Sequence, residues 1–485
     1  MQLYEYNAFE LSELLEDKSI SSVELTNSVI DRINAVDKQL NAFITVCSER
    51  AIGQAKSVDE KRINGEKLPR LAGIPIGLKD NISLSGVKMT CASRMLENYI
   101  APYNATVADK LETIGAVLIG KLNMDEFAMG SSNENSFFGA VKNPYDTNRV
   151  AGGSSGGCAV AVSAGEIPCA LGSDTGGSIR QPAAFCGVVG LKPTYSAVSR
   201  YGLTAFASSF DQIGPVCRCV KDTALLFDAI SGHDRRDSTS AQREYLSCYD
   251  SITDNIKGLR IGVPRTLFED ICSEDVLDSF NSALAVLEQC GAQVDNIELD
   301  NTEFALPAYY VISSAEASSN LARFDGVRYG FRASGCKDLN DMYISTRSEG
   351  FGDEVKRRIM LGTFVLSAGY YDSYYKNALS AAKLITCSIK DQFEKVDIIA
   401  MPTSPETAFK LGAKTNDPIE MYKSDVFTVF ANLTGLPAIS VPCGLAQNSL
   451  PVGIQFMADS FCEQRLFDAA YAYECARGAI AKPSI

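Results

Sequence analysis

Two serines lie in short glycine-rich segments whose composition suits nucleophilic chemistry. Ser154 lies within Gly152–Gly157, and Ser178 ends a second segment, Gly172–Ser178. Glycine allows neighbouring backbone amides to converge on one point, as an oxyanion hole requires. Such clusters are also common in flexible turns, but each of these borders a small apolar segment rather than a polar linker. The two serines are therefore candidates for covalent chemistry, and suitable oxyanion donors are the backbone amides of Thr175, Gly176 and Gly177.

The base that would activate such a serine must be something other than histidine. The chain has one histidine, His233, in a polar segment, and it has no G-x-S-x-G nucleophile elbow. Lys79 directly follows the apolar run 71–78, where desolvation would disfavour the ammonium and lower its pKa. A neutral lysine can take a proton from a serine hydroxyl, which is the Ser–Lys form of nucleophile activation. A lysine at a strand end is most often solvated, however, and spacing alone does not show that Lys79 meets either serine.

Other chemistries lack the residues that they need. One histidine and no close cysteine pair at ligand spacing argue against a zinc site. The glycine-rich segments match neither G-x-x-x-x-G-K-[ST] nor G-x-G-x-x-G, so no motif supports phosphate binding. The net charge is −14, whereas a chain that grips nucleic acid unaided needs an excess of Lys and Arg. We therefore expect no metal site and no tight binding of nucleic acid by this chain alone.

The elements that must position these residues alternate between helices and strands. Residues 9–37 predict two helices, the second opened by a capping box of Ser21 and Glu24. A buried helix of small residues is expected at 158–164, and a longer helix at 274–290. Apolar runs predict buried strands at 71–78, 116–119, 259–263, 294–299, 396–401 and 451–457. This alternation favours an α/β fold with a largely parallel or mixed sheet.

The bulk composition favours one large domain in the cytoplasm. No low-complexity linker or fixed-period repeat divides the 485 residues, so we expect a single domain with insertions. The 15 cysteines are odd in number and scattered, which fits reduced thiols better than a disulfide framework. The N-terminus has no signal-peptide pattern, and no apolar run approaches the roughly 18 residues that a membrane span needs. We expect a cytoplasmic protein without membrane association.

The two serine segments and the setting of the lysine resemble the amidase signature family. The resemblance is carried by Gly152–Gly157, by Asp174–Ala183 and by Gly77–Asp80. It implies that Ser178 is the acyl-enzyme nucleophile, that Ser154 is a bridging serine with a cis peptide bond before it, and that Lys79 is the base.

The resemblance covers essentially the whole chain and implies the amidase signature fold. That fold is a single α/β domain with a twisted mixed β-sheet surrounded by helices. On this basis we expect an N-terminal helical segment at 1–65, a signature core at about 70–215, and the remaining sheet with substrate-side insertions at 216–485.

Three further segments resemble one branch of that family, the A subunits of the aspartyl/glutamyl-tRNA amidotransferases. They are Asn123–Ser132, Val355–Thr363 and Met421–Thr428. This resemblance implies glutamine as the substrate. Glutamine is a zwitterion, so a selective pocket needs a cation for its α-carboxylate and an anion for its α-ammonium.

The implied glutamine-binding residues are Ser131, Tyr309, Arg358 and Asp425. Arg358 would hold the α-carboxylate, since an arginine can bind a carboxylate bidentately, and Asp425 would hold the α-ammonium. Tyr309 would add a hydrogen-bonding wall. Without the resemblance, Arg358 would be interpreted as part of a solvated helix face, because Lys356 and Arg357 precede it.

The reaction implied by the resemblance is glutamine hydrolysis that supplies ammonia to a partner. That partner, the B subunit of the amidotransferase, would use ATP and magnesium to amidate Glu-tRNA(Gln) or Asp-tRNA(Asn), and a small C subunit would brace the assembly. The chain itself would need no cofactor and would meet tRNA only through the B subunit. Two alternatives stay open: a stand-alone amidase acting on other carboxamides, and a catalytically silent scaffold on the same fold. Activity without partners would favour the first alternative, and an active-site acylation probe would test the second.

Overall fold

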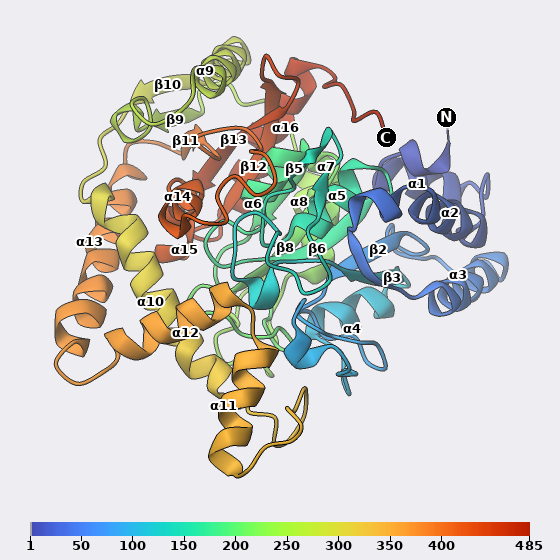
Figure 1. Cartoon of the computed structure of the whole chain (residues 1–485). Helices are drawn as coiled ribbons and strands as arrows, with labels where there is room; N and C mark the ends of the chain where they lie inside the picture. The colour runs from blue at the N-terminus through green and yellow to red at the C-terminus, as the bar shows by residue number, and fades with distance from the viewer. Residues whose placement is uncertain (1) are drawn as a thin grey trace.

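The alternating apolar segments assemble into one long mixed β-sheet wrapped by helices (Figure 1). The computed structural model describes residues 2–485. Within those residues the sheet has 11 strands, in the spatial order β1 (Phe43–Val46), β3 (Val117–Leu122), β2 (Pro75–Lys79), β6 (Cys169–Asp174), β8 (Gln212–Cys217), β7 (Val189–Lys192), β12 (Ala438–Leu445), β13 (Pro451–Ala458), β11 (Ile398–Pro402), β9 (Arg260–Val263) and β10 (Gln293–Asn296). A separate two-stranded sheet joins β4 (Lys142–Asn143) and β5 (Asp146–Val150).

The sheet is mixed, and its strand directions bring distant segments to one edge. Strand β2 pairs in parallel with β3 and β6, and β9 pairs in parallel with β10 and β11, while the other neighbours are antiparallel. Because β2 and β6 are parallel, their carboxyl ends, Lys79 and Asp174, lie at the same edge. The antiparallel strand β8 begins there too, with Gln212 paired to Asp174. All residues of β2, β6 and β8 are buried.

Helices cover both ends and the faces of the sheet. They are α1 (Ala8–Glu16), α2 (Ser22–Leu40), α3 (Ser48–Ile63), α4 (Thr106–Thr113), α5 (Gly156–Ser163), α6 (Arg180–Cys186), α7 (Val220–Ile230), α8 (Cys248–Ser251), α9 (Glu274–Gln289), α10 (Ala305–Asn320), α11 (Leu339–Gly350), α12 (Asp353–Val365), α13 (Asn377–Gln392), α14 (Pro418–Tyr422), α15 (Val429–Leu433) and α16 (Glu463–Arg477). Figure 1 shows α1 to α3 on the side of the molecule where β2 and β3 lie, and α10 to α13 on the opposite side. None of the helices in residues 2–485 is both long and apolar enough to cross a bilayer.

Local sequence explains the helices that flank the site. The predicted capping box opens α2, where the Ser21 side chain accepts from the Glu24 amide and the Glu24 carboxylate accepts from the Ser21 amide. Helix α5 is buried from Gly156 to Val162, as its small residues predict. A Cβ on Gly157 would lie 2.4 Å from the Asn123 carbonyl oxygen, so only glycine allows α5 to pack this close to the loop after β3.

The expected α/β architecture is confirmed, and the chain forms a single domain around the sheet. Each predicted strand is present with its bounds shifted by a few residues, as in β2, which covers only the second half of 71–78 and includes Lys79 itself. In the expected N-terminal segment, residues 2–65 contain α1, α2 and α3, and β1, between α2 and α3, forms an edge strand of the common sheet. The strands that were not predicted are β1, β4, β5, β6, β7, β8 and β12, and among them β6 carries the residues that lead to Ser178.

Candidate active site

Lys79 and Ser154 meet at the carboxyl edge of β2, as the resemblance implied. The Lys79 Nζ donates to the Ser154 Oγ at 2.7 Å and to the Ser173 carbonyl oxygen at 3.2 Å. Both Lys79 and Ser154 are fully buried. The expected cis peptide bond is present between Gly153 and Ser154.

Burial shifts the proton equilibrium of Lys79 towards the neutral amine. Burial lowers the pKa of Lys79 to about 8, while the nearby carboxylates of Asp125, Asp174 and Asp211 act in the opposite direction. None of those carboxylates forms an ion pair with Lys79 among the described residues. The side chain can therefore accept a proton from Ser154 at a pH near neutrality.

Ser178 lies on the neighbouring loop and is the most accessible member of the predicted set. The Ser155 amide donates to the Ser178 carbonyl oxygen at 3.0 Å, which holds the two serine loops together. Ser178 is 8% exposed, whereas Lys79 and Ser154 have no exposed surface. The partly exposed Ser178 is thus placed as a nucleophile that meets substrate, and the buried Lys79 is placed as a base that does not.

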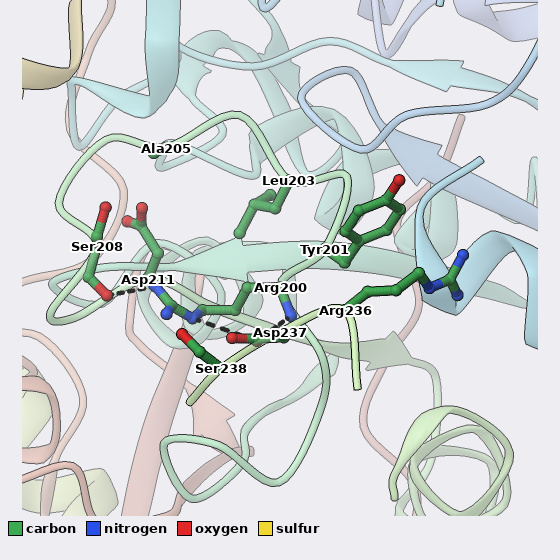
Figure 2. Close-up of a pocket in the computed structure, with 9 residues that line it drawn as sticks. All are labelled: Arg200, Tyr201, Leu203, Ala205, Ser208, Asp211, Arg236, Asp237 and Ser238. Atoms are coloured by element: carbon green, nitrogen blue, oxygen red, sulfur yellow. Dashed lines mark hydrogen bonds and ion pairs between the residues drawn. The ribbon is translucent and has the colours of Figure 1, made fainter. Parts of the chain in front are cut away.

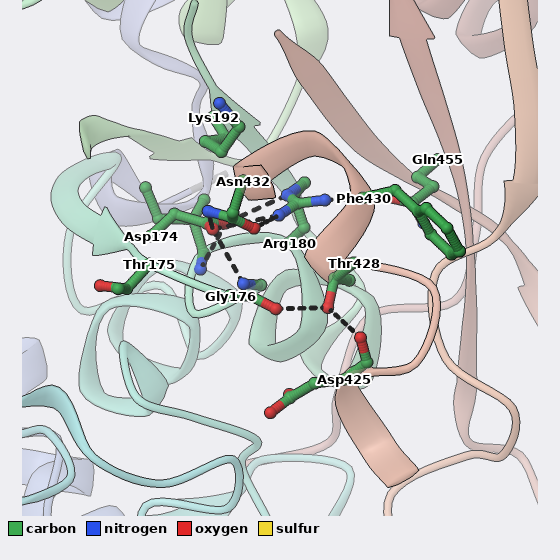
Figure 3. A network of polar contacts seen from close by, with 12 residues as sticks. Asp174, Thr175, Gly176, Arg180, Lys192, Asp425, Thr428, Phe430, Asn432 and Gln455 are labelled. Atoms are coloured by element: carbon green, nitrogen blue, oxygen red, sulfur yellow. Dashed lines mark hydrogen bonds and ion pairs between the residues drawn. The ribbon is translucent and has the colours of Figure 1, made fainter. Parts of the chain in front are cut away.

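The residues before Ser178 are held by side chains from three directions. The Gly177 amide donates to Asp174 Oδ1 at 2.8 Å, and the Thr175 hydroxyl donates to Asp211 Oδ1 at 2.7 Å. The Thr428 hydroxyl donates to the Gly176 carbonyl oxygen at 2.6 Å (Figure 3). Because the Gly177 amide already has an acceptor, the amides of Thr175 and Gly176 are the better oxyanion donors of the predicted three.

A buried ionic network fixes the turn between β6 and α6, and the sequence analysis missed it. Arg180 donates to both oxygens of Asp174 at 3.0 Å, to Asn432 Oδ1 at 2.8 Å and to Gln455 Oε1 at 3.0 Å (Figure 3). Asp174 and Arg180 are fully buried. Burial would raise the pKa of Asp174, but the Arg180 charge and the hydrogen bonds from Arg180 and Asn432 lower it to about 2. A signal was present, since both charged residues flank the Thr175–Ser178 turn.

Ser131 and Asp425, which are 294 residues apart, meet beside this loop. The Ser131 hydroxyl donates to Asp425 Oδ2 at 2.8 Å, and the Tyr310 hydroxyl donates to the same oxygen at 2.7 Å. Burial raises the pKa of Asp425 to about 6, although those two hydrogen bonds and the Arg358 charge act against it. Both hydrogen bonds found among the described residues go to Oδ2, which leaves Oδ1 to accept from an incoming ammonium.

Arg358 is buried rather than part of a solvated helix face. Its guanidinium lies 4.5 Å from the Tyr310 ring centroid and 4.7 Å from that of Tyr422, and its Nε donates to Glu354 Oε1 at 2.7 Å. The Nη1 atom is buried and has no hydrogen-bond partner among the described residues. One end of the guanidinium is thus held by Glu354, and the other end remains for a carboxylate.

A cavity of about 410 Å³ adjoins these recognition residues. Ser131, Glu354, Arg358 and Tyr422 are among the side chains that line it. The predicted wall residue Tyr309 packs directly on the oxyanion loop, since a Cβ on Gly176 would lie 2.4 Å from its hydroxyl oxygen. The structure therefore brings Ser131, Asp425, Arg358 and Tyr309 to one region beside the Gly176–Gly177 turn that precedes Ser178. Tyr310 and Glu354 were not among the predicted residues, although they lie one residue from Tyr309 and four residues from Arg358.

A second cavity, of about 230 Å³, is lined in part by Asp211 (Figure 2), whose Oδ1 accepts from the Thr175 hydroxyl. Its cations already have carboxylate partners: Arg200 lies 3.7 Å from Asp237, and Arg236 lies 3.0 Å from Asp109. The cavity beside Arg358, with its unpartnered guanidinium nitrogen, is therefore the better candidate for a zwitterionic substrate.

Comparisons with known proteins agree with this geometry. A family model described as Amidase matches residues 24–467. The A subunit of glutamyl-tRNA(Gln) amidotransferase from Moorella thermoacetica is 56% identical over 474 residues, covering 98% of this chain and 97% of that protein. The same-named protein of Caldanaerobacter subterraneus is 54% identical over 483 residues, covering 100% and 99%. The crystal structure of the same-named protein from Thermotoga maritima superposes with a TM-score of 0.83 at 41% identity, covering 100% of this chain and 98% of that chain.

Proposed function

This chain belongs to the amidase family, and from that premise we propose that it is the glutamine-hydrolysing A subunit of a glutamyl-tRNA(Gln) amidotransferase. The proposal is supported by relatives of that name that align over the full length. It is supported equally by the Lys79–Ser154 hydrogen bond, by the backbone hydrogen bond from Ser155 that holds Ser178 next to this pair, and by a nearby cation and anion for a zwitterionic amide.

In the proposed mechanism, the Ser178 Oγ attacks the side-chain amide carbon of glutamine. Its proton passes through the Ser154 hydroxyl to the Lys79 Nζ, and the backbone amides before Ser178 stabilise the tetrahedral oxyanion. Return of the proton from Lys79 to the leaving nitrogen releases ammonia and leaves a glutamyl ester on Ser178. Water, deprotonated through the same relay, attacks the ester, releases glutamate and restores the Ser178 hydroxyl.

Substrate selection follows from the two ends of the zwitterion. Arg358 offers its unpartnered nitrogen to the α-carboxylate, and Asp425 offers Oδ1 to the α-ammonium. Asp425 is tied to the turn before Ser178, because the Thr428 hydroxyl donates to the carbonyl oxygens of both Gly176 and Asp425. This link between Asp425, which would bind the α-ammonium, and the Thr175–Ser178 turn is the observation that carries the proposal.

The assembly that we propose divides the labour between this chain and two partners. The B subunit binds tRNA and uses ATP and magnesium to amidate Glu-tRNA(Gln) with the ammonia made here, and Asp-tRNA(Asn) is a second candidate acceptor. The C subunit completes a cytoplasmic heterotrimer. This chain provides no cofactor site in the proposal, and its net charge of −14 agrees with leaving tRNA to a partner.

Replacing Arg358 tests the assignment of the substrate. Arg358→Ala should lower kcat/KM for glutamine by about 100-fold, the scale of losing a charged hydrogen-bond partner, because the α-carboxylate is left unpaired. Hydrolysis of a small neutral amide should fall far less. Both substrates are assayed with the purified assembly and with an exposed control variant, Lys376→Met. Equal losses on glutamine and on the neutral amide would instead indicate a structural role for Arg358 and a stand-alone amidase.

A further inference from the structure

Glu126 is a buried carboxylate that the proposed mechanism does not use. It lies on the loop after β3, is 3% exposed, and accepts from two groups in another part of the chain. Its Oε2 accepts from the Gly352 amide at 2.7 Å, and its Oε1 accepts from the Ser93 hydroxyl. The Ser93 hydroxyl also lies 3.3 Å from the Gly350 carbonyl oxygen, so the turn from α11 to α12 is held at both of its sides.

Gly352 is the N-cap residue of α12, the helix that carries Arg358. Glycine has no side chain with which to cap the first turn, and Glu126 accepts from the N-cap amide itself, the donor that a capping-box glutamate binds in other helices. A Cβ on Gly352 would lie 2.5 Å from Glu126 Oε2, which shows how closely the carboxylate approaches. Further along, α12 meets α10 at Gly362, where a Cβ would lie 2.0 Å from the Ser314 carbonyl oxygen. These two contacts anchor both ends of the helix.

The loop after β3 that contains Glu126 is also hydrogen-bonded to Ser154 and to Asp425. The Asp125 amide donates to the Ser154 carbonyl oxygen at 3.2 Å, next to Glu126 in the chain. Ser131, at the far end of the loop, donates to Asp425. The first turn of α12 contains Glu354, which holds Arg358 at 2.7 Å. A continuous set of contacts therefore runs from the bridging serine through Glu126 and α12 to the Arg358 guanidinium.

We infer that Glu126 is a positioning residue for glutamine recognition, because it anchors the N-terminus of α12 and so sets where Arg358 lies relative to Ser154. This inference rests on the proposed function of Arg358. Burial raises the pKa of Glu126 to about 7, against the hydrogen bonds from Ser93 and Gly352, which lower it. A glutamine side chain can accept from the Gly352 amide and donate to the Ser93 oxygen in the same place.

The test compares Glu126→Ala with the rescuing variant Glu126→Gln in the assembled enzyme. Glu126→Ala should raise KM for glutamine about tenfold or more while lowering kcat much less, since a displaced helix misplaces Arg358 rather than the nucleophile. Hydrolysis of a small neutral amide should fall by no more than about twofold. Glu126→Gln should stay within about threefold of the wild type on both substrates.

Glu24→Ala is a matched control. Its carboxylate also accepts from a backbone amide, at 2.7 Å, and from a serine hydroxyl, but at the start of α2, far from the site in sequence. It should change neither KM nor kcat. If Glu126→Ala does not fold, Gly352→Ala tests the same contact. Gly352 is exposed, and a Cβ at this position would displace the Glu126 carboxylate.

The outcomes separate this inference from the proposed function. Selective loss of glutamine use in Glu126→Ala or Gly352→Ala, with rescue by Glu126→Gln, supports it. Equal losses on both amides, or no loss in a folded variant while Arg358→Ala still loses glutamine, overturn it and leave the proposed function standing. A wild-type assembly that does not hydrolyse glutamine rejects the proposed function itself, and the inference with it.

Discussion

At the scale of single residues, the site depends on a lysine that is both buried and unpaired. Lys121, one strand away, is equally buried but forms an ion pair with Asp80 at 3.0 Å. Lys79 instead donates to a hydroxyl and a carbonyl oxygen, which leave its protonated form without a compensating negative charge in contact. This difference between two buried lysines on adjacent strands is what makes Lys79 suited to act as a base.

The first prediction concerns the proton relay. Ser178→Ala should lower glutaminase activity by at least about three orders of magnitude, and Ser154→Ala and Lys79→Ala should come close to that loss. Double variants should lose little more, because the three residues act as one unit. The measurement is glutamate release by single and double variants of the purified assembly. Near-normal turnover in Lys79→Ala would contradict the mechanism.

The second prediction follows from the pKa of the same lysine. Because burial lowers the pKa of Lys79 to about 8, its neutral and active form is gained as the pH rises through that value. The rate for glutamine should therefore increase between about pH 7 and pH 9 and then level off. A pH–rate profile measures this limb, with enzyme stability checked at each pH. A profile that falls over that interval would mean that the protonated lysine is the active form.

Residue types alone predicted the three catalytic candidates but not their partners. Ser154 and Ser178 were found because glycine surrounds them, and Lys79 because an apolar run precedes it. Tyr310 could not be preferred over Tyr309, because only the helical rotation of α10 decides that Tyr310 faces Asp425 while Tyr309 packs on Gly176. Asp425 itself was reached only through the resemblance.

At the scale of elements, the turn from β6 to α6 is the part of the fold that presents Ser178. Strand β6 was not predicted, because its sequence, CALGSD, has small residues in place of the β-branched and aromatic ones that mark strands. Its small residues instead allow close packing, as at Gly172, where a Cβ would lie 3.0 Å from Ile179 and Ser155. Close packing between elements thus outweighs the low strand propensity of these small residues, and sequence patterns depend on that propensity.

The third prediction concerns the ionic network that fixes this turn. Arg180→Met should destabilise the fold by about 3–5 kcal/mol, because it leaves the buried Asp174 carboxylate without its cation. Urea unfolding measures the change, and Lys376→Met, which removes one side of an exposed pair, should leave the midpoint unchanged.

The stability lost in Arg180→Met should depend on pH in a defined direction. The pKa of Asp174 is lowered to about 2 in the folded chain, so its stabilising effect is present above the ordinary aspartate value and is lost as the pH falls through about 2. Without Arg180 that carboxyl takes up a proton at higher pH. The stability difference between wild type and Arg180→Met should therefore narrow on acidification. A constant difference down to acid pH would show that the ion pair is not its cause.

At the scale of the whole molecule, the long sheet explains why spacing could not predict the site. Lys79 and Ser154 are 75 residues apart, and Ser131 and Asp425 are 294 apart. The α/β class followed from alternating patterns, but strand order did not, because β12 and β13 insert between β7 and β11. The recognition residues come from the loop after β3, from α10, from α12 and from the segment before α15, which only tertiary packing brings to the edge where β2 and β6 end.

The last prediction concerns what this chain does without partners. A body with a net charge of −14 repels a polyanion, so the isolated chain should bind tRNA weakly or not at all at physiological salt. It should also release glutamate slowly, because an uncoupled glutaminase would lose its ammonia to solvent. Filter binding and glutamate-release assays, each run with and without co-expressed partners, measure both. Tight tRNA binding by the chain alone would overturn the proposed division of labour. Full glutaminase activity alone would keep the Ser178 chemistry but favour a stand-alone amidase.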